Sequence, residues 1–237
     1  MSKHIFEKPL IKAKFQKRYK RFFVDALLEN GESIISHTNN TGSMKGLLEE
    51  GRDAYFLHHD DPKRKLQYTF QMIDVGTSLV GVNTNIPNSL VYESIVAGDI
   101  PELTGYENAK REVKYGKEGK SRIDVFLTDV NKPDCYVEIK NTTLREGNYA
   151  TFPDAVTTRG QKHLEELILE AEKGNRAVMF YLAQRSDCKA FKPADSIDPE
   201  YGKILRKAVK AGVEVLCYAC ELNPTGITLA KPLKIEL

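Results

Sequence analysis

The sequence predicts a chain of mixed α/β class in two parts: an N-terminal β-barrel over residues 1–84 and a mixed sheet flanked by helices over residues 85–237. Two observations predict this division. Up to about residue 82, strand-like runs alternate with turn signals at short and regular spacing, which is typical of a small barrel. Beyond that point the segments follow the order α, β, β, β, α, β, α, β, which favours helices packed on a sheet.

The first part contains six strand-like runs. Clusters of Asn, Asp, Gly and Pro separate them, for example at residues 39–42 and 60–62, and such clusters mark turns. The runs lie near residues 10–15, 19–28, 32–38, 52–58, 66–73 and 78–83.

The second part opens with a helix-compatible stretch, followed by three strands joined by loops short enough for hairpins. The clearest helix begins at Thr158, where Gln161 three residues later fits a capping box, and it ends at Gly174. The helices are predicted near residues 88–97, 158–174 and 198–212, and the strands at residues 111–115, 122–129, 135–141, 177–183 and 213–220.

Length and composition are those of a soluble globular protein. The 237 residues, 41% hydrophobic and 29% charged, suffice for buried cores, and the net charge of +2 is too small by itself to indicate a nucleic-acid partner. No apolar run reaches the roughly 18 residues of a membrane helix, and the N-terminus lacks the apolar core of a secretory signal. The four cysteines are expected to be free thiols. We expect a cytoplasmic protein without a membrane partner, and the sequence carries no signal for its oligomeric state.

Asp124, Glu138 and Lys140 form the most informative pattern in the chain. Asp124 stands between apolar residues in one predicted strand, while Glu138 and Lys140 lie two residues apart in the next and therefore share a face. Two carboxylates from adjacent strands can hold a hard cation such as Mg²⁺ or Mn²⁺ beside phosphate, and a nearby Lys can orient a water. The pattern predicts a phosphodiesterase centre, although taken alone it also fits a solvated cross-strand ion pair.

The strand and helix order, with Asp and Glu-x-Lys on the second and third strands, resembles the core of the restriction-endonuclease-like, or PD-(D/E)xK, fold. Five stretches also resemble the sugar fermentation stimulation protein family. They are residues 38–46 (TNNTGSMKG), 81–90 (GVNTNIPNSL), 111–124 (REVKYGKEGKSRID), 134–144 (DCYVEIKNTTL) and 152–167 (FPDAVTTRGQKHLEEL). The resemblance runs almost end to end, and it implies an N-terminal OB barrel, a C-terminal nuclease-like domain and DNA binding.

The chain departs from the family pattern at one place in the barrel. The family usually has Cys-Pro before Asn-Thr-Gly, whereas here Thr38 and Asn39 precede that motif. The loss of Pro loosens the expected turn. Asn40 and Gly42 remain expected nucleic-acid contacts, through backbone or phosphate interactions.

Within this context three further residues are candidates for the centre. Glu112, on the neighbouring strand, is expected to reach the metal as a third carboxylate; the alternative is a surface Glu paired with Arg122 or Lys114. Gln161 lies on the helix where nuclease-like folds often place a polar residue near the metal. His163 is a candidate for the same role, but a lone helical His is more often a surface or packing residue. The predicted catalytic set is Asp124, Glu138, Lys140, Glu112 and Gln161, with Asp124, Glu138 and Glu112 as metal ligands.

Two Pro-Asp pairs spell the first letters of the motif without fitting it. Asp134 is only four residues before Glu138, which is too close for the separate strand that the geometry requires. Asp154 lies in the loop before the predicted helix, where it is expected to shape the rim of the site.

Basic residues suggest where a nucleic acid would lie. The segment 12–21 interleaves basic and aromatic residues, which can track phosphates and stack on bases, although some of the rings must belong to the barrel core. Arg122 shares a strand face with Asp124, where it is expected to hold either that carboxylate or a phosphate; the alternative is a plain ion pair. Arg159 and Lys162 lie in the first turns of a helix, where anions are favoured. The predicted nucleic-acid-binding set is Arg18, Arg21, Lys14, Lys17, Asn40, Gly42, Arg122, Arg159 and Lys162.

Two functions are compatible with these observations. The first is a DNA-binding protein with a magnesium-dependent nuclease centre that acts on DNA. The second is a non-catalytic DNA-binding transcriptional regulator of sugar (maltose) metabolism that uses a nuclease-like fold. The intact Asp, Glu and Lys favour the enzyme, and the choice between single- and double-stranded DNA stays open.

Overall fold

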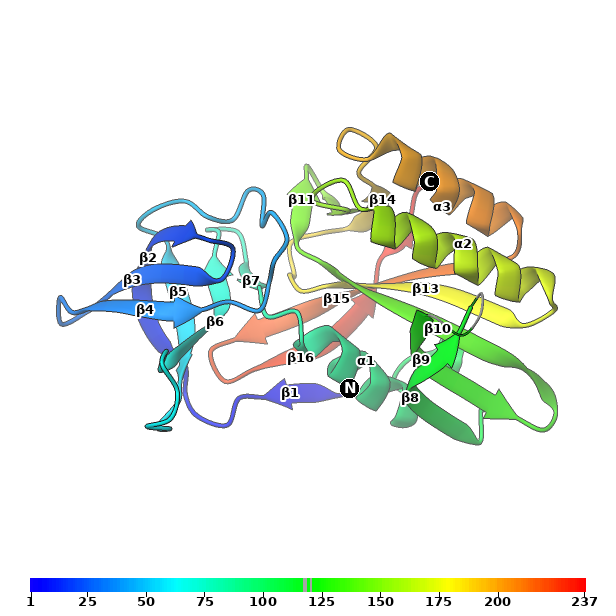
Figure 1. The fold of residues 1–237 in the computed structure, drawn as a ribbon, viewed down its shortest axis with the longest axis horizontal. Coiled ribbons are helices and arrows are strands. Elements are labelled where there is room, and N and C mark those ends of the chain that lie inside the picture. The colour runs from blue at the N-terminus through cyan, green and yellow to red at the C-terminus, as the bar shows by residue number, and fades with distance from the viewer. Residues whose placement is uncertain (117–118, 120) are drawn as a thin grey trace.

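The structure, a computed structural model, describes residues 1–116, 119 and 121–237. It contains two bodies, a β-barrel and a larger sheet with helices on both faces (Figure 1). This arrangement confirms the predicted fold class. Over the described residues, no helix is long and apolar enough to cross a membrane.

The N-terminal body is an OB-like barrel with five strands in its closed ring. The strands pair in the order β4-β3-β2-β5-β6, and a parallel pairing between β4 and β6 closes the ring. Phe15, Phe56 and Phe70 stack in its core, because alternate residues of each strand face inward. The strands are β2 (Ile11–Tyr19), β3 (Phe23–Leu28), β4 (Ser33–His37), β5 (Asp53–His58) and β6 (Tyr68–Asp74), with β7 (Leu79–Gly81) beside β6.

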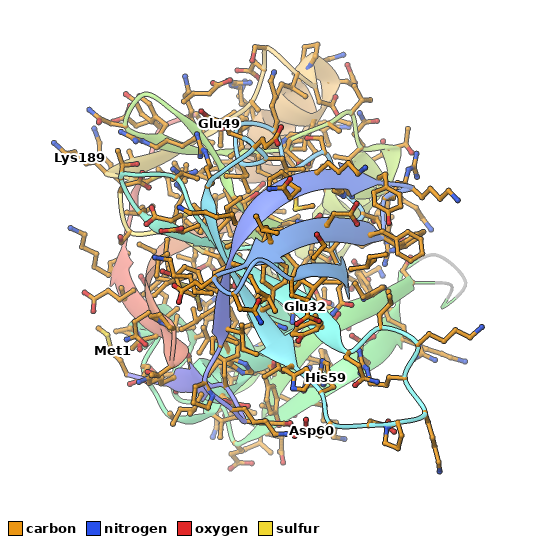
Figure 2. All side chains as sticks on the ribbon, turned by 90° about the vertical axis from the view of Figure 1, so that its left-hand side faces the viewer. Met1, Glu32, Glu49, His59, Asp60 and Lys189 are labelled. Carbon is orange, nitrogen blue, oxygen red and sulfur yellow. The ribbon has the colours of Figure 1, made fainter. Side chains whose placement is uncertain are left out.

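The end of the barrel that points away from the second body carries charged turns. Figure 2, which views the molecule from this end, shows Glu32 in the β3–β4 turn and Asp60 in the β5–β6 loop. The Asp60 carboxylate pairs with Lys8 and with His58. This end is therefore a solvated, ion-paired surface.

The second body is built on a mixed sheet in the order β1-β16-β15-β13-β10-β9-β8. The central strands β10, β13 and β15 run parallel, because α2 and α3 form the crossovers between them. The strands are β1 (Lys3–Ile5), β8 (Asn108–Tyr115), β9 (Ser121–Asp129), β10 (Lys132–Thr142), β13 (Arg176–Ala183), β15 (Glu214–Asn223) and β16 (Gly226–Pro232). The helices are α1 (Ile86–Val96), α2 (Thr158–Glu172) and α3 (Pro199–Lys210), with a 3₁₀ turn at Pro101–Leu103.

The sheet has a separate apolar cluster on each face. α1 covers one face and packs with Val137 and Ile139 of β10. α2 and α3 cover the other face, where Leu164 packs with Met179 of β13 (Figure 1). Since side chains alternate along a strand, Glu138 points to the face of α2.

Two parts of this architecture differ from the sequence prediction. The barrel was expected to begin at residue 1, but residues 3–5 form β1, which pairs with β16 at the edge of the second sheet. The segment around residues 142–157, for which no helix or strand was predicted, contributes to a small additional sheet whose strands are too short to show a period. This sheet contains β11 (Leu144–Glu146), β12 (Tyr149–Phe152), β14 (Ala190–Pro193) and β17 (Lys234–Ile235).

The start of α2 also differs from the prediction. Thr157, not Thr158, is the N-cap, and its hydroxyl oxygen accepts the N–H of Gly160 at 3.0 Å. Gln161 does not close a capping box, because its amide nitrogen donates to both carboxylate oxygens of Asp198, at 3.0 and 3.1 Å. Asp198 is the N-cap of α3, so Gln161 ties the two helices together.

Candidate functional site

The register of three neighbouring strands places Glu112, Asp124 and Glu138 in one row across the sheet. In the β8–β9 ladder, the pairs that flank Glu112 of β8 and Asp124 of β9 are Arg111 with Val125 and Val113 with Ile123. The β9–β10 ladder ends at Val125 opposite Val137, so Asp124 and Glu138 of β10 are the next residues beyond it. Residues opposite each other on neighbouring strands are close in space. Three carboxylates that are separate in the sequence therefore lie close together on the three strands at the β8 edge of the sheet.

Asp124 is held from two sides. Its Oδ1 accepts a hydrogen bond from Nδ2 of Asn88, at the start of α1, and its Oδ2 accepts the amide N–H of Ile139; both distances are 2.7 Å. Burial and the negative charge of Glu138 raise the pKa of Asp124 to about 7. The carboxyl group is thus fixed in orientation and ionises near neutral pH.

Glu138 is 2% exposed, and its two carboxylate oxygens have different surroundings. Oε1 receives the Lys140 ammonium at 2.6 Å and is also contacted by Nδ1 of His163 on α2. Oε2 is buried and has no hydrogen-bond partner among the described residues. Burial raises the pKa of Glu138, but the positive charge of Lys140 and the contact with His163 outweigh it and hold the pKa below its ordinary value. The result is a buried, ionised carboxylate with one unsatisfied oxygen.

Glu112 has an unusual backbone conformation. Its φ of 54° lies in the left-handed region, which costs an L-residue roughly 1–2 kcal/mol. Residues held in such conformations cluster at functional sites. The side chain is exposed, and its charge adds to the rise in the pKa of Asp124.

These residues line a cleft of about 540 Å³ between β8, β9, β10 and the starts of α1 and α2. Three basic side chains, those of Arg122, Arg159 and Lys162, are exposed in its lining and give it a positive rim. Arg159 also contacts Nε2 of His163 at 3.4 Å. The lining residues are Asn88, Glu112, Ser121, Arg122, Asp124, Glu138, Arg159, Lys162 and His163.

The donor set suits a hard divalent cation in kind, since it consists of carboxylates with one unsatisfied buried oxygen. No group of three or more His, Cys, Asp and Glu side chains is already arranged as a ligand cluster in the part of the chain that the structure describes. Protein donors engage both oxygens of Asp124 and Oε1 of Glu138. A cation can therefore use the unsatisfied Oε2 of Glu138 and the second lone pair of Oδ1 of Asp124, which Asn88 leaves open.

Two cleft residues, and one residue outside the cleft, differ from the sequence prediction. Asn88 was missed, because a single Asn near the start of a helix gives no signal of its own. His163 was given mainly a surface or packing role, yet it is 8% exposed and contacts Glu138 directly. Gln161, predicted at the centre, lies instead against Asp198 and does not line the cleft.

The barrel residues predicted to bind nucleic acid divide into two groups. Arg18 is half-buried, and its guanidinium donates to the backbone carbonyls of Arg21, Asn40 and Gly42 at 2.8–3.1 Å. Lys14 and Lys17 form ion pairs with Asp53 and Asp25, at 2.6 and 3.6 Å.

Arg21, in contrast, is exposed in the β2–β3 turn. This turn has two successive left-handed residues, Lys20 (φ 48°) and Arg21 (φ 64°), which tighten the hairpin. The next residue, Phe22, is 44% exposed and stacks on His37 with a ring-centroid distance of 6.3 Å. The turn thus presents basic groups beside an exposed aromatic ring.

Asn40 and Gly42 have a structural position at the junction of the two bodies. Oδ1 of Asn40 accepts the N–H of Gly42 at 2.8 Å. A Cβ on Gly42 would come within 3.2 Å of the Asp154 carboxylate, which accepts the N–H of Met44 at 2.9 Å. Asp154, predicted at the rim of the site, therefore anchors the barrel loop to the segment that precedes α2.

Comparison with known proteins identifies the family. A family described as "Sugar fermentation stimulation protein RE domain" matches residues 85–226, and "SfsA N-terminal OB domain" matches residues 17–82. The sugar fermentation stimulation protein homolog of Nitrosococcus oceani is 50% identical and covers 98% of this chain and 99% of its own. The homolog of Paramagnetospirillum magneticum is 46% identical over 98% of both chains. The solved structure of Pyrococcus furiosus SfsA in complex with Ca²⁺ matches with a TM-score of 0.88 at 27% identity and covers 100% of both chains. This chain belongs to the sugar fermentation stimulation protein family.

Proposed function

We propose that the protein is a divalent-metal-dependent nuclease that acts on DNA, with Asp124 and Glu138 as metal ligands and Glu112 as a third carboxylate. One observation carries the proposal: the buried, ionised Glu138 keeps an unsatisfied oxygen beside Asp124, in a cleft with a basic rim. Such an oxygen is unfavourable unless a partner satisfies it. Mg²⁺ or Mn²⁺ is the expected partner, because both prefer carboxylate ligands.

The Ca²⁺ complex of the Pyrococcus furiosus relative supports a divalent cation in this family. A bound cation would neutralise charge on phosphate oxygens and lower the pKa of a coordinated water. Within the protein, Asn88 and the Ile139 amide fix the carboxylate of Asp124, so its orientation is set before a ligand arrives.

The remaining cleft residues have roles that follow from their positions. Lys140 lies 2.6 Å from Oε1 of Glu138, where its ammonium keeps that carboxylate ionised and can orient a water near the phosphate. Arg122, Arg159 and Lys162 supply the positive charge that a phosphodiester backbone requires. The exposed β2–β3 turn of the barrel, with Arg21 and Phe22, is the proposed second contact with the DNA strand.

The test is cleavage of single-stranded, duplex and branched DNA, and of RNA, by purified protein in Mg²⁺ or Mn²⁺. Asp124→Asn and Glu138→Gln should remove cleavage and leave DNA binding unchanged. Asp134→Asn, on the same sheet but outside the cleft lining, is the matched control and should cleave normally. Binding of DNA without cleavage of any substrate would overturn the enzymatic proposal.

A second candidate function is supported by a different observation. Protein donors already engage three of the four carboxylate oxygens of Asp124 and Glu138. This arrangement is compatible with a DNA-binding regulator that has no catalytic activity. If it is such a regulator, Asp124→Asn will change neither DNA affinity nor any response to Mg²⁺.

A further inference from the structure

A second concave site lies where the barrel meets the β11–β12 hairpin. Its volume is about 400 Å³, and among the described residues its lining shares no member with the cleft around Asp124. Both bodies contribute to it, through the β4–β5 loop, the β6–β7 turn, the β11–β12 hairpin and the segment after β13. The lining residues are Lys45, Gly46, Leu47, Arg52, Val75, Thr77, Arg145, Gly147 and Arg185.

The site carries an excess of positive charge. Its cationic side chains are those of Lys45, Arg52, Arg145 and Arg185. Two carboxylates face them: Asp187 pairs with Arg145 and Arg185, and Glu49 pairs with Arg52. The Glu49 side chain is 71% exposed, so water screens its charge; Figure 2 shows it above the barrel strands in that view.

The guanidinium groups are held in place by the protein itself. Arg185 is 4% exposed and donates to both oxygens of Asp187, at 2.7 and 2.9 Å, and to the carbonyl of Thr143 at 2.6 Å. Arg145 donates to Asp187 at 3.0 Å and to the hydroxyl of Thr77 at 3.2 Å. Burial raises the pKa of Asp187, but its hydrogen bonds with Arg185 and Thr77 outweigh it and lower the pKa to about 2. The cluster is therefore ionised and preorganised at neutral pH.

Two donors in this cluster are unsatisfied. Nη1 of Arg52 and Nε of Arg145 are buried without a hydrogen-bond acceptor among the described residues. A buried donor on a charged group is unfavourable until an acceptor satisfies it. Guanidinium groups match the oxygens of phosphate well, because their N–H groups form a planar fork.

We propose that this pocket binds a phosphate group. The phosphate belongs either to a nucleic-acid strand or to a small soluble phosphate. In both cases it contacts the barrel through Arg52 and Lys45 and the second body through Arg145, and so it bridges the two bodies. The site is independent of the proposed metal centre, since it would bind phosphate even if the cleft never cleaves DNA.

The first arm of the test uses inorganic phosphate and ³¹P NMR line broadening on the full-length protein. Arg52→Gln and Arg145→Gln should each weaken phosphate binding by about tenfold, the effect expected for loss of one charge-assisted contact. Lys210→Gln, which removes one exposed charge at the end of α3, is the matched control and should bind phosphate as the unaltered protein does.

The second arm measures the affinity of a labelled DNA oligonucleotide as a function of salt concentration. If the phosphate belongs to a strand, Arg145→Gln will lower the slope of log affinity against log salt by about 0.7–0.9, and inorganic phosphate will compete with the oligonucleotide. If the ligand is a small phosphate, phosphate binding will fall in this variant and oligonucleotide affinity will stay constant. Either result supports the site.

Lys45→Gln keeps the proposal testable if an Arg substitution disturbs folding. The Lys45 side chain is exposed, and its ammonium makes no ion pair within the residues that the structure describes, so its removal should not affect stability. It should still weaken phosphate binding severalfold. Unchanged phosphate and oligonucleotide binding in Lys45→Gln, and in whichever Arg variants fold, would overturn the proposal.

Discussion

Oδ2 of Asp124 accepts the amide N–H of Ile139 at 2.7 Å, beside the point where the ladder between β9 and β10 stops. A side chain thus satisfies a backbone donor that the neighbouring strand leaves unpaired. The bond lowers the pKa of Asp124, but burial and the charge of Glu138 raise it more, to about 7. The pairing between β9 and β10 therefore ends where the carboxylates lie close together.

The stability of the metal-free protein should depend on the charge of Asp124. Its folded-state pKa of about 7 lies above the ordinary value of 3.8, so folding favours the protonated carboxyl group. The stability that this preference contributes is fully present below pH 4 and is lost as the pH rises through 7. Asp124→Asn should therefore raise the free energy of unfolding by about 2–4 kcal/mol at pH 8 and leave it nearly unchanged at pH 4. Urea unfolding at both pH values measures this, with Asp134→Asn as the control. A loss of stability at pH 8 would contradict it.

Binding of a divalent cation should depend on pH for the same reason. A cation competes with the proton on Asp124, so its apparent affinity should rise by about tenfold per pH unit below pH 7 and level off above it. Calorimetric titration with Mn²⁺ between pH 5.5 and 8.5 measures the profile. An affinity that does not change over this range would exclude Asp124 as a ligand.

Asn88 should act as a positioning residue. Its Nδ2 donates to Oδ1 of Asp124 at 2.7 Å, and this bond favours the ionised carboxylate. Asn88→Ala should therefore shift the pH profile of Mn²⁺ binding upward by about 0.5–1 unit and slow cleavage. Ser89→Ala is the control, because among the described residues the Ser89 hydroxyl donates to the carbonyls of Ile86, in its own helix, and of Asn85, which precedes the helix. If the two variants give the same profile, Asn88 has only a packing role.

Arg18 and Arg21 should respond to substitution in opposite ways. Arg18→Ala removes the donors to the carbonyls of Arg21, Asn40 and Gly42 and should lower the free energy of unfolding by about 1–3 kcal/mol. Arg21→Ala should leave stability within about 0.5 kcal/mol and weaken DNA binding by severalfold. Thermal unfolding and fluorescence anisotropy with an oligonucleotide separate these effects. A stable Arg18→Ala protein with selectively weakened DNA binding would contradict the assignment.

Glu112 allows backbone strain to be separated from charge. Because its φ is 54°, Glu112→Gly should stabilise the protein by about 1 kcal/mol, whereas Glu112→Gln keeps the strained backbone. Both variants should weaken Mn²⁺ binding, since both remove the third carboxylate. Equal stability of the two variants would show that the conformation is not strained.

The sequence predicted the centre best where the candidate residues follow the two-residue period of a β-strand. The two-residue spacing of Glu138 and Lys140 and the strand that carries Asp124 placed these residues on the correct elements, and the family resemblance supported the order of the elements. Gln161 was assigned from helix position alone. That assignment failed because the residue's partner, Asp198, comes from another helix that no local pattern reveals.

Long-range contacts account for the other differences. Arg18 was expected to bind phosphate because it lies in a basic segment, but its partners at Asn40 and Gly42 are more than 20 residues away. β1 has three residues and finds its partner, β16, near the opposite end of the chain. The strands of the small sheet are likewise too short for a period of two to appear. Tertiary pairing, not local preference, determines these elements.

The pairing of β1 with β16 also determines how the barrel is attached. The chain starts in the second sheet, leaves it to build the barrel, and returns through α1, so the barrel is tethered at both of its ends. Two tethers and the Asp154 anchor restrict rotation between the bodies far more than one linker would. A nucleic-acid strand bound by the barrel would consequently reach the cleft around Asp124 at a fixed distance along that nucleic acid.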